Sequence, residues 1–218
     1  MNDDIFSFSK EFSTVDFLCL ISASAVLRKE KFLRRLFVSA KERSINRRKI
    51  YEALLQTYLF AGFPSALISL SIFNEYFPPV NSLRSNNSNI KFNVIGEVNC
   101  RKIYGDKFEK LIENISAFSP EFAEWLVSEG YGKVFGRKHL TLKERELINV
   151  SILAALKFSS QLYSHINGAY RLKATLREIR DAVAILSCTG KKDCEKFGLR
   201  VLEKFLKQKG ARPKPALP

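Results

Sequence analysis

The chain has 218 residues, of which 46% are hydrophobic and 27% charged, and its formal net charge is +14. This composition is typical of a globular protein with a sizeable core and excludes a largely disordered chain. No apolar run reaches the roughly 18 residues that a membrane span needs, and the acidic start of the chain lacks a signal-peptide pattern. We therefore expect a soluble, cytoplasmic protein.

The first region, residues 1–80, shows helical patterns and contains a strongly basic run from Arg28 to Lys49. Such a run can attract nucleic acid, acidic membranes or anionic small molecules. Because no nucleic-acid fold signature accompanies it, a solvated surface is the favoured interpretation. Nucleic acid is a less favoured alternative partner, and we expect no membrane partner. The polar stretch Asn81–Asn89 then predicts a linker over residues 81–95.

Helix-start signals recur in the second region, residues 96–203. Ser119-Pro120 places a cap residue before a proline, and Thr141–Glu144 and Thr175–Glu178 are capping boxes ahead of apolar-periodic runs. Since no strand alternation is present, we predict an all-α fold. The expected helices of this region span residues 142–157, 160–172 and 176–187. The basic tail, residues 204–218, contains three prolines after Gly210 and predicts disorder.

The two regions share an internal repeat. A shift of 129 residues aligns Phe17–Leu54 with Glu146–Val183 without a gap, and the identities are mostly small or apolar residues. The polar residues differ between the copies. Opposite Glu146, Gln161 and His165 the first copy has Phe17, Phe32 and Leu36. We therefore predict a degenerate duplication in which only the second copy carries a functional site.

Glu146 and His165 are the strongest candidates for chemistry. His165 is one of two histidines in the chain, and it shares a helix face with Gln161 four residues earlier. The connection between the two helices is short, which makes them neighbours and allows Glu146 to reach His165. Arg145, beside the acid, is expected to be a surface ion-pair residue, as is common for arginine.

Several segments in the right order resemble the carboxymuconolactone decarboxylase family. They are RKIYEALLQTYLFAGFPSAL (Arg48–Leu67), CRKIYGDKF (Cys100–Phe108), YGKVFGRKHLTLKERELI (Tyr131–Ile148) and QLYSHINGAYR (Gln161–Arg171). The resemblance covers roughly Arg48 to Val183. It implies the all-helical alkylhydroperoxidase-D-type (AhpD-like) fold and assembly into trimers or hexamers.

One branch of this superfamily, the thiol peroxidases, uses a Glu, then CxxC, then a His. With Glu146 as the acid, the two Cys positions fall on Phe158 and Gln161, and the His falls on His165. Disulfide exchange needs a nucleophilic thiolate and a resolving thiol, which neither residue supplies. A thiol-dependent peroxidase is therefore the disfavoured alternative.

The decarboxylase branch is more similar to this chain, and it implies a lyase that needs no metal or cofactor. The resemblance implies that Glu146 and His165 belong to the site, and we assign proton transfer to His165 and its orientation to Glu146. Arg137 would hold a carboxylate of a small lactone acid, and Gln161 and Tyr163 would be donors in the pocket wall. A non-catalytic scaffold or regulatory protein remains a further alternative, because His165 could also be a hydrogen-bonded structural residue.

Overall fold

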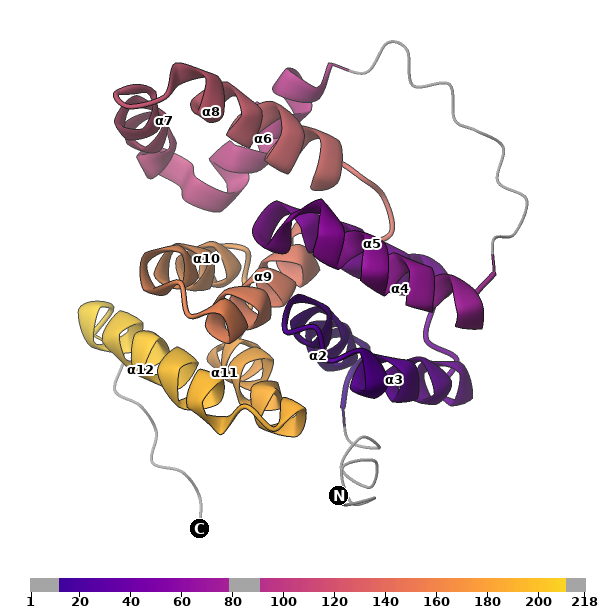
Figure 1. Ribbon diagram of the computed structural model, residues 1–218. Helices are drawn as coiled ribbons and strands as arrows, with labels where there is room; N and C mark the ends of the chain where they lie inside the picture. The colour runs from indigo at the N-terminus through magenta and orange to yellow at the C-terminus, as the bar shows by residue number, and fades with distance from the viewer. Residues whose placement is uncertain (1–11, 79–90, 211–218) are drawn as a thin grey trace.

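All regular structure in the described part of the chain is helical, which confirms the all-α fold class (Figure 1). The computed structural model describes residues 12–78 and 91–210. Residues 81–90 of the expected linker, 81–95, and the tail after Gly210 lie outside these ranges.

The first four helices of the described residues form one unit, in the order α2 (Thr14–Val26), α3 (Glu30–Glu42), α4 (Arg47–Gln56) and α5 (Tyr58–Tyr76). A capping box between Ser13 and Asp16 fixes the start of α2, which is buried from Phe17 to its end. α5 packs against α2, α3 and α4, and its chain bends at Gly62, where φ is +73°. α5 therefore consists of a short helical segment before Gly62 and a longer one after it.

The last four helices form a second unit, in the order α9 (Leu142–Leu156), α10 (Ser159–Arg171), α11 (Leu176–Ala184) and α12 (Lys192–Gln208), with the 3₁₀ turn η4 (Ile185–Thr189) before α12. The predicted capping boxes at Thr141 and Thr175 are both present. Because α12 continues to Gln208, the first residues of the expected disordered tail are helical.

The two units repeat the same backbone plan. Under the 129-residue shift, α3 falls on α10 and α4 starts with α11. The turns agree as well. Arg28 and Lys157 have φ of +54° and +60°, and Ser44 and Lys173 have φ of +53° and +67°. Four non-glycine residues in the left-handed region at equivalent positions are a signature that generic helix periodicity does not produce. The backbone therefore confirms the internal duplication.

A single hydrophobic core joins the two units. α9 lies in the middle of the molecule and contacts α2, α10, α11 and α12 (Figure 1). The core cluster runs from Phe17 in α2 to Leu206 in α12. A hydrogen bond also joins α2 and α9, in which Ser151 Oγ donates to the carbonyl of Cys19 at 3.3 Å. The duplicated units thus bury their central helices against each other.

A third group of helices lies between the two units in sequence and has its own small core. It consists of α6 (Phe92–Tyr104), η2 (Gly105–Lys107), α7 (Phe108–Ser116), α8 (Pro120–Trp125) and the π-helix η3 (Leu126–Val134). α6 and η3 pack closely because a glycine on each helix lies against the backbone of the other. A Cβ on Gly96 would lie 2.0 Å from the carbonyl oxygen of Val127, and one on Gly132 would lie 2.1 Å from that of Phe92. α6 also packs on α10, so this group covers one side of the second unit.

Among the described residues, no single helix is long and apolar enough to cross a membrane. α4 and α5 meet that test only as a pair, which is bent by 119°.

Candidate active site

Glu146 and His165 meet in the structure. The Thr141 cap sets the start of α9, which places Glu146 in its second turn, and the left-handed Lys157 turns the chain so that α10 returns beside α9. His165 Nδ1 lies 2.9 Å from Glu146 Oε2. Glu146 is fully buried and His165 is 7% exposed. The fold therefore holds an acid and an imidazole in hydrogen-bonding contact away from bulk water.

Two amides extend this contact toward the first unit. Asn149 is three residues after Glu146, and its Nδ2 lies 3.5 Å from Glu146 Oε1 and 3.2 Å from His165 Nδ1. Gln56 of α4 donates from Nε2 to Asn149 Oδ1 at 2.5 Å and to the Arg145 carbonyl at 3.0 Å. With His165 donating from Nδ1 to the carboxylate, both oxygens of Glu146 accept a hydrogen bond. The first copy thus helps to position a site that the second copy carries.

A buried ion network continues from Gln56. Arg145 donates from Nη1 to Gln56 Oε1 at 3.1 Å and from Nη2 to Glu52 Oε2 at 3.0 Å. Arg145 is fully buried, so its expected surface position was wrong. Its charge is compensated by Glu52, which is only 2% exposed. Burial lowers the pKa of Arg145, and the Glu52 carboxylate opposes that shift.

Arg137 lies at the outer end of this network. Its Nε and Nη2 donate to the Glu52 carboxylate at 2.9–3.1 Å. The side chain is 39% exposed, and its hydrogen bonds to described residues come from Nε and Nη2 and not from Nη1. Arg137 is therefore anchored on Glu52 and keeps Nη1 as a further donor.

The other two predicted residues lie apart from the pair. Gln161 is exposed on α10. Tyr163 donates its hydroxyl to Gln208 Oε1 at 2.5 Å and packs its ring on Phe205 of α12. The structure thus brings together Glu146 and His165, whereas Gln161 is exposed and Tyr163 contacts α12.

Aromatic and thiol groups from α6 and η3 lie near the Glu146 carboxylate. Burial and then the Glu146 carboxylate raise the pKa of the Cys100 thiol to about 12. Burial and the same carboxylate raise the pKa of Tyr104, whose hydroxyl lies 2.5 Å from that of the fully enclosed Tyr131. On the α4–α5 side, the ring of Phe60 meets His165 edge-on at 6.1 Å. Sequence reasoning missed these surrounding groups, and it missed the contacts that Gln56 and Glu52 make with the second unit. The three-residue spacing of Asn149 from Glu146 is the one signal of a shared helix face.

The cysteines are dispersed and unpaired. Cys19, Cys100 and Cys194 are buried and Cys188 is partly exposed. Burial is the main cause that raises the pKa of each thiol, which holds them protonated. Within the described ranges, no three His, Cys, Asp or Glu side chains are grouped so that they could hold a metal ion.

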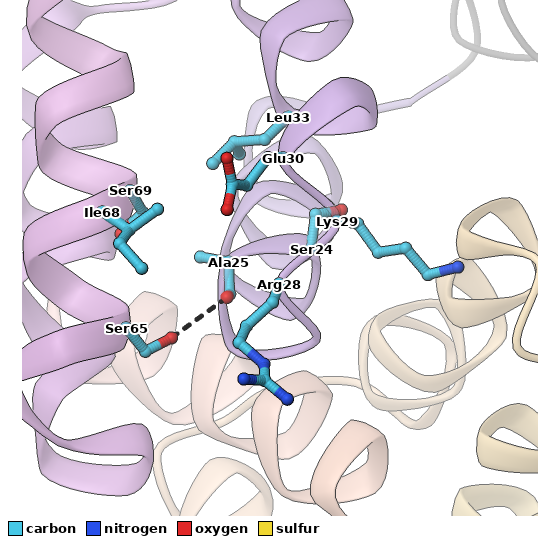
Figure 2. A pocket seen from close by; sticks show the side chains of 9 residues that line it. All are labelled: Ser24, Ala25, Arg28, Lys29, Glu30, Leu33, Ser65, Ile68 and Ser69. Atoms are coloured by element: carbon cyan, nitrogen blue, oxygen red, sulfur yellow. Dashed lines mark hydrogen bonds between the residues drawn. The ribbon is translucent and has the colours of Figure 1, made fainter.

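The first copy carries no equivalent of the pair. Phe17 and Leu36, which replace Glu146 and His165, are buried core residues. Near the α2–α3 turn, the counterpart of the α9–α10 turn, a cavity of about 10 Å³ is lined by Ser24, Arg28 and Ser65, among others (Figure 2). It has room for about one water molecule, so this cavity is too small for a lactone acid.

The fold and the site together define an all-helical, duplicated protein with one buried Glu–His pair. Residues 120–204 match the model of the carboxymuconolactone decarboxylase family, which confirms the resemblance over α8 to α12. The segments Arg48–Leu67 and Cys100–Phe108 lie outside that match.

Two relatives of known name are similar to this chain. Peroxisomal protein 2 of Schizosaccharomyces pombe is 25% identical over 62% of this chain, and the chain spans 65% of that protein's length. The 4-carboxymuconolactone decarboxylase of Acinetobacter baylyi is 21% identical over 51% of this chain and 84% of its own length. Over residues 120–204 the chain is thus similar to the carboxymuconolactone decarboxylase family.

Proposed function

We propose that the protein catalyses cofactor-free proton transfer, coupled to decarboxylation, on a small carboxylated lactone or a related acid. One observation carries the proposal: the 2.9 Å contact between His165 Nδ1 and Glu146 Oε2, in a buried site within the segment that matches the family. The similarity to a named 4-carboxymuconolactone decarboxylase supports this substrate class.

Three residues, His165, Glu146 and Arg137, have definite parts in the proposed reaction. Loss of CO2 from the acid leaves its electron pair on carbon as a dienolate, and that carbon must then take up a proton. Because Nδ1 of His165 donates to Glu146, Nε2 is the atom that gives the proton when the ring is an imidazolium, and the Glu146 carboxylate stabilises that cation. Arg137, held by Glu52, offers Nη1 to a substrate carboxylate. Gln161 and Tyr163 remain predictions as substrate donors.

The test is turnover of 4-carboxymuconolactone by the purified protein, measured as CO2 release. His165→Ala should lower kcat/KM by about 100-fold or more, since general acid–base catalysis contributes on that order. His139→Ala is the matched control, because His139 is the other histidine and lies exposed in the loop before α9. Full activity in His165→Ala would contradict the assignment.

A non-catalytic role is the second candidate, and a specific observation favours it. Glu146 and His165 are enclosed and satisfy each other, as structural polar pairs do. In that case the wild type would turn over no lactone acid, whereas His165→Ala would still lower the melting temperature.

The cytoplasmic location stays a prediction.

A further inference from the structure

The outer face of α5 exposes large apolar side chains. Phe63 is 67% exposed, Leu67 is 64% exposed and Ile68 is 42% exposed. α5 carries no charged residue before Glu75. A contiguous exposed apolar face on a helix of a globular protein marks an interaction site.

The duplication shows that the scaffold does not need this face to be apolar. The buried positions of α5 and α12 correspond under the 129-residue shift, as in the pairs Ser65 and Cys194, Ser69 and Gly198, Ile72 and Val201, and Phe73 and Leu202. At the exposed positions, Phe63 and Leu67 correspond to Lys192 and Lys196, which are both exposed. The same place in the fold carries lysines in one copy and apolar residues in the other, so something other than folding accounts for Phe63 and Leu67.

Two basic side chains and one acidic side chain adjoin this face, which leaves its edge with a net positive charge. Ile68 lines a hollow together with Arg28, Lys29 and Glu30 at the start of α3 (Figure 2). Neither Arg28 nor Lys29 has an ion-pair partner among the described residues. The partner of this face should therefore combine apolar surface with negative charge.

The α6–α7–α8 group carries a groove of that kind. It has a volume of about 540 Å³, and its apolar floor includes Phe108, Ile112 and Val127. Four glutamates rim it: Glu97, Glu109, Glu113 and Glu124. Glu97 and Glu109 are paired with Arg101, whereas Glu113 and Glu124 have no ion-pair partner in the described part of the chain.

We propose that the Phe63–Leu67 face of α5 in one molecule docks into the α6–α7–α8 groove of a second copy. Arg28 and Lys29 would then lie opposite Glu113 and Glu124. A single contact explains an apolar face with a basic edge and an apolar groove with an acidic rim, which is the complementarity expected of an interface. Because the two surfaces differ, the contact is head-to-tail, and repetition closes a ring where the rotation allows it.

Sedimentation velocity on the full chain tests the proposal. The wild type should sediment as an oligomer, and Phe63→Lys/Leu67→Lys should sediment as a monomer, with association weakened about 100-fold or more. These lysines are those that α12 carries at the same positions, so the fold should tolerate them. Glu113→Lys/Glu124→Lys should give the same result from the other surface. Phe158→Lys, which places a lysine at another exposed apolar position, should leave the oligomer intact.

Mixing the two monomeric variants distinguishes this contact from a symmetric one. Each variant retains one intact surface, so the mixture should form a one-to-one dimer that grows no further. A mixture that stays monomeric would overturn the proposal, as would an unchanged oligomer in either variant. A monomeric wild type that binds phosphatidylserine vesicles through Phe63 and Leu67 would also overturn it, because the face would then serve a membrane.

Discussion

Gly168 illustrates how the site constrains single residues. It lies on α10, one turn after His165, where α10 meets α6 and α9. A Cβ at this position would lie 2.4 Å from Glu146 Oε2 and 2.9 Å from Ile103 Cγ2. A glycine is therefore required for the acid to reach His165 while α6 closes over it.

We expect Gly168→Ala to displace the Glu146 carboxylate and to lower the free energy of unfolding by about 1–3 kcal/mol, the usual cost of overpacking. Urea denaturation measures the loss. Gly130→Ala is the control, because a Cβ there meets nothing within 4 Å. Equal stability of the two variants would show that the site relaxes around the methyl group.

Residue spacing was enough to predict the Glu146–His165 pair, because both lie on consecutive helices joined by a short turn. The contacts of Gln56 and Glu52 could not be found this way. These residues belong to α4, and only the packing of the first unit on the second brings them beside Asn149 and Arg145. Arg145 was misplaced for the same reason, since burial of an arginine depends on a partner distant in sequence.

At the scale of elements, capping boxes and apolar periodicity predicted α9, α10 and α11 closely, whereas α12 was not among the expected helices. The π-helix η3 was not predicted, because a wider helical turn has no distinct apolar period. The kink of α5 is also a local backbone event, at Gly62. The left-handed turns at Arg28 and Lys157, however, belong to the duplicated plan itself.

These turns make a paired prediction. A non-glycine residue in the left-handed region costs roughly 1–2 kcal/mol of stability, and a glycine at that position removes this strain. Glycine also makes the unfolded chain more flexible, which offsets part of the gain. Arg28→Gly and Lys157→Gly should therefore each raise the free energy of unfolding, by up to about 1 kcal/mol. Lys196→Gly, inside α12, should lower it by about 1 kcal/mol. Opposite signs at Arg28 and Lys157 in thermal or urea unfolding would contradict equivalence of the two turns.

At the scale of the whole molecule, the two copies share one core while the α6–α8 group has a second, smaller one. α2 is buried from Phe17 to Val26, and α9 is buried from Glu144 to Ala155. By contrast, α7 buries only Phe108 and α8 only Ala123. The sequence divides the chain at the linker, but the packing groups α2 with α9, which are far apart in sequence.

Local stability should follow this packing. Helices with many buried side chains open only when the whole molecule unfolds, whereas sparsely buried helices open locally. In hydrogen exchange followed by mass spectrometry, we expect α2 and α9 to exchange slowest and at similar rates. α7 and α8 should exchange on the order of 100-fold faster, since local opening costs less than global unfolding. The Phe63→Lys/Leu67→Lys variant is the appropriate sample, because a second copy would otherwise cover the groove. Faster exchange in α2 than in α9 would mean that the first copy unfolds on its own, and that the shared core does not couple the two.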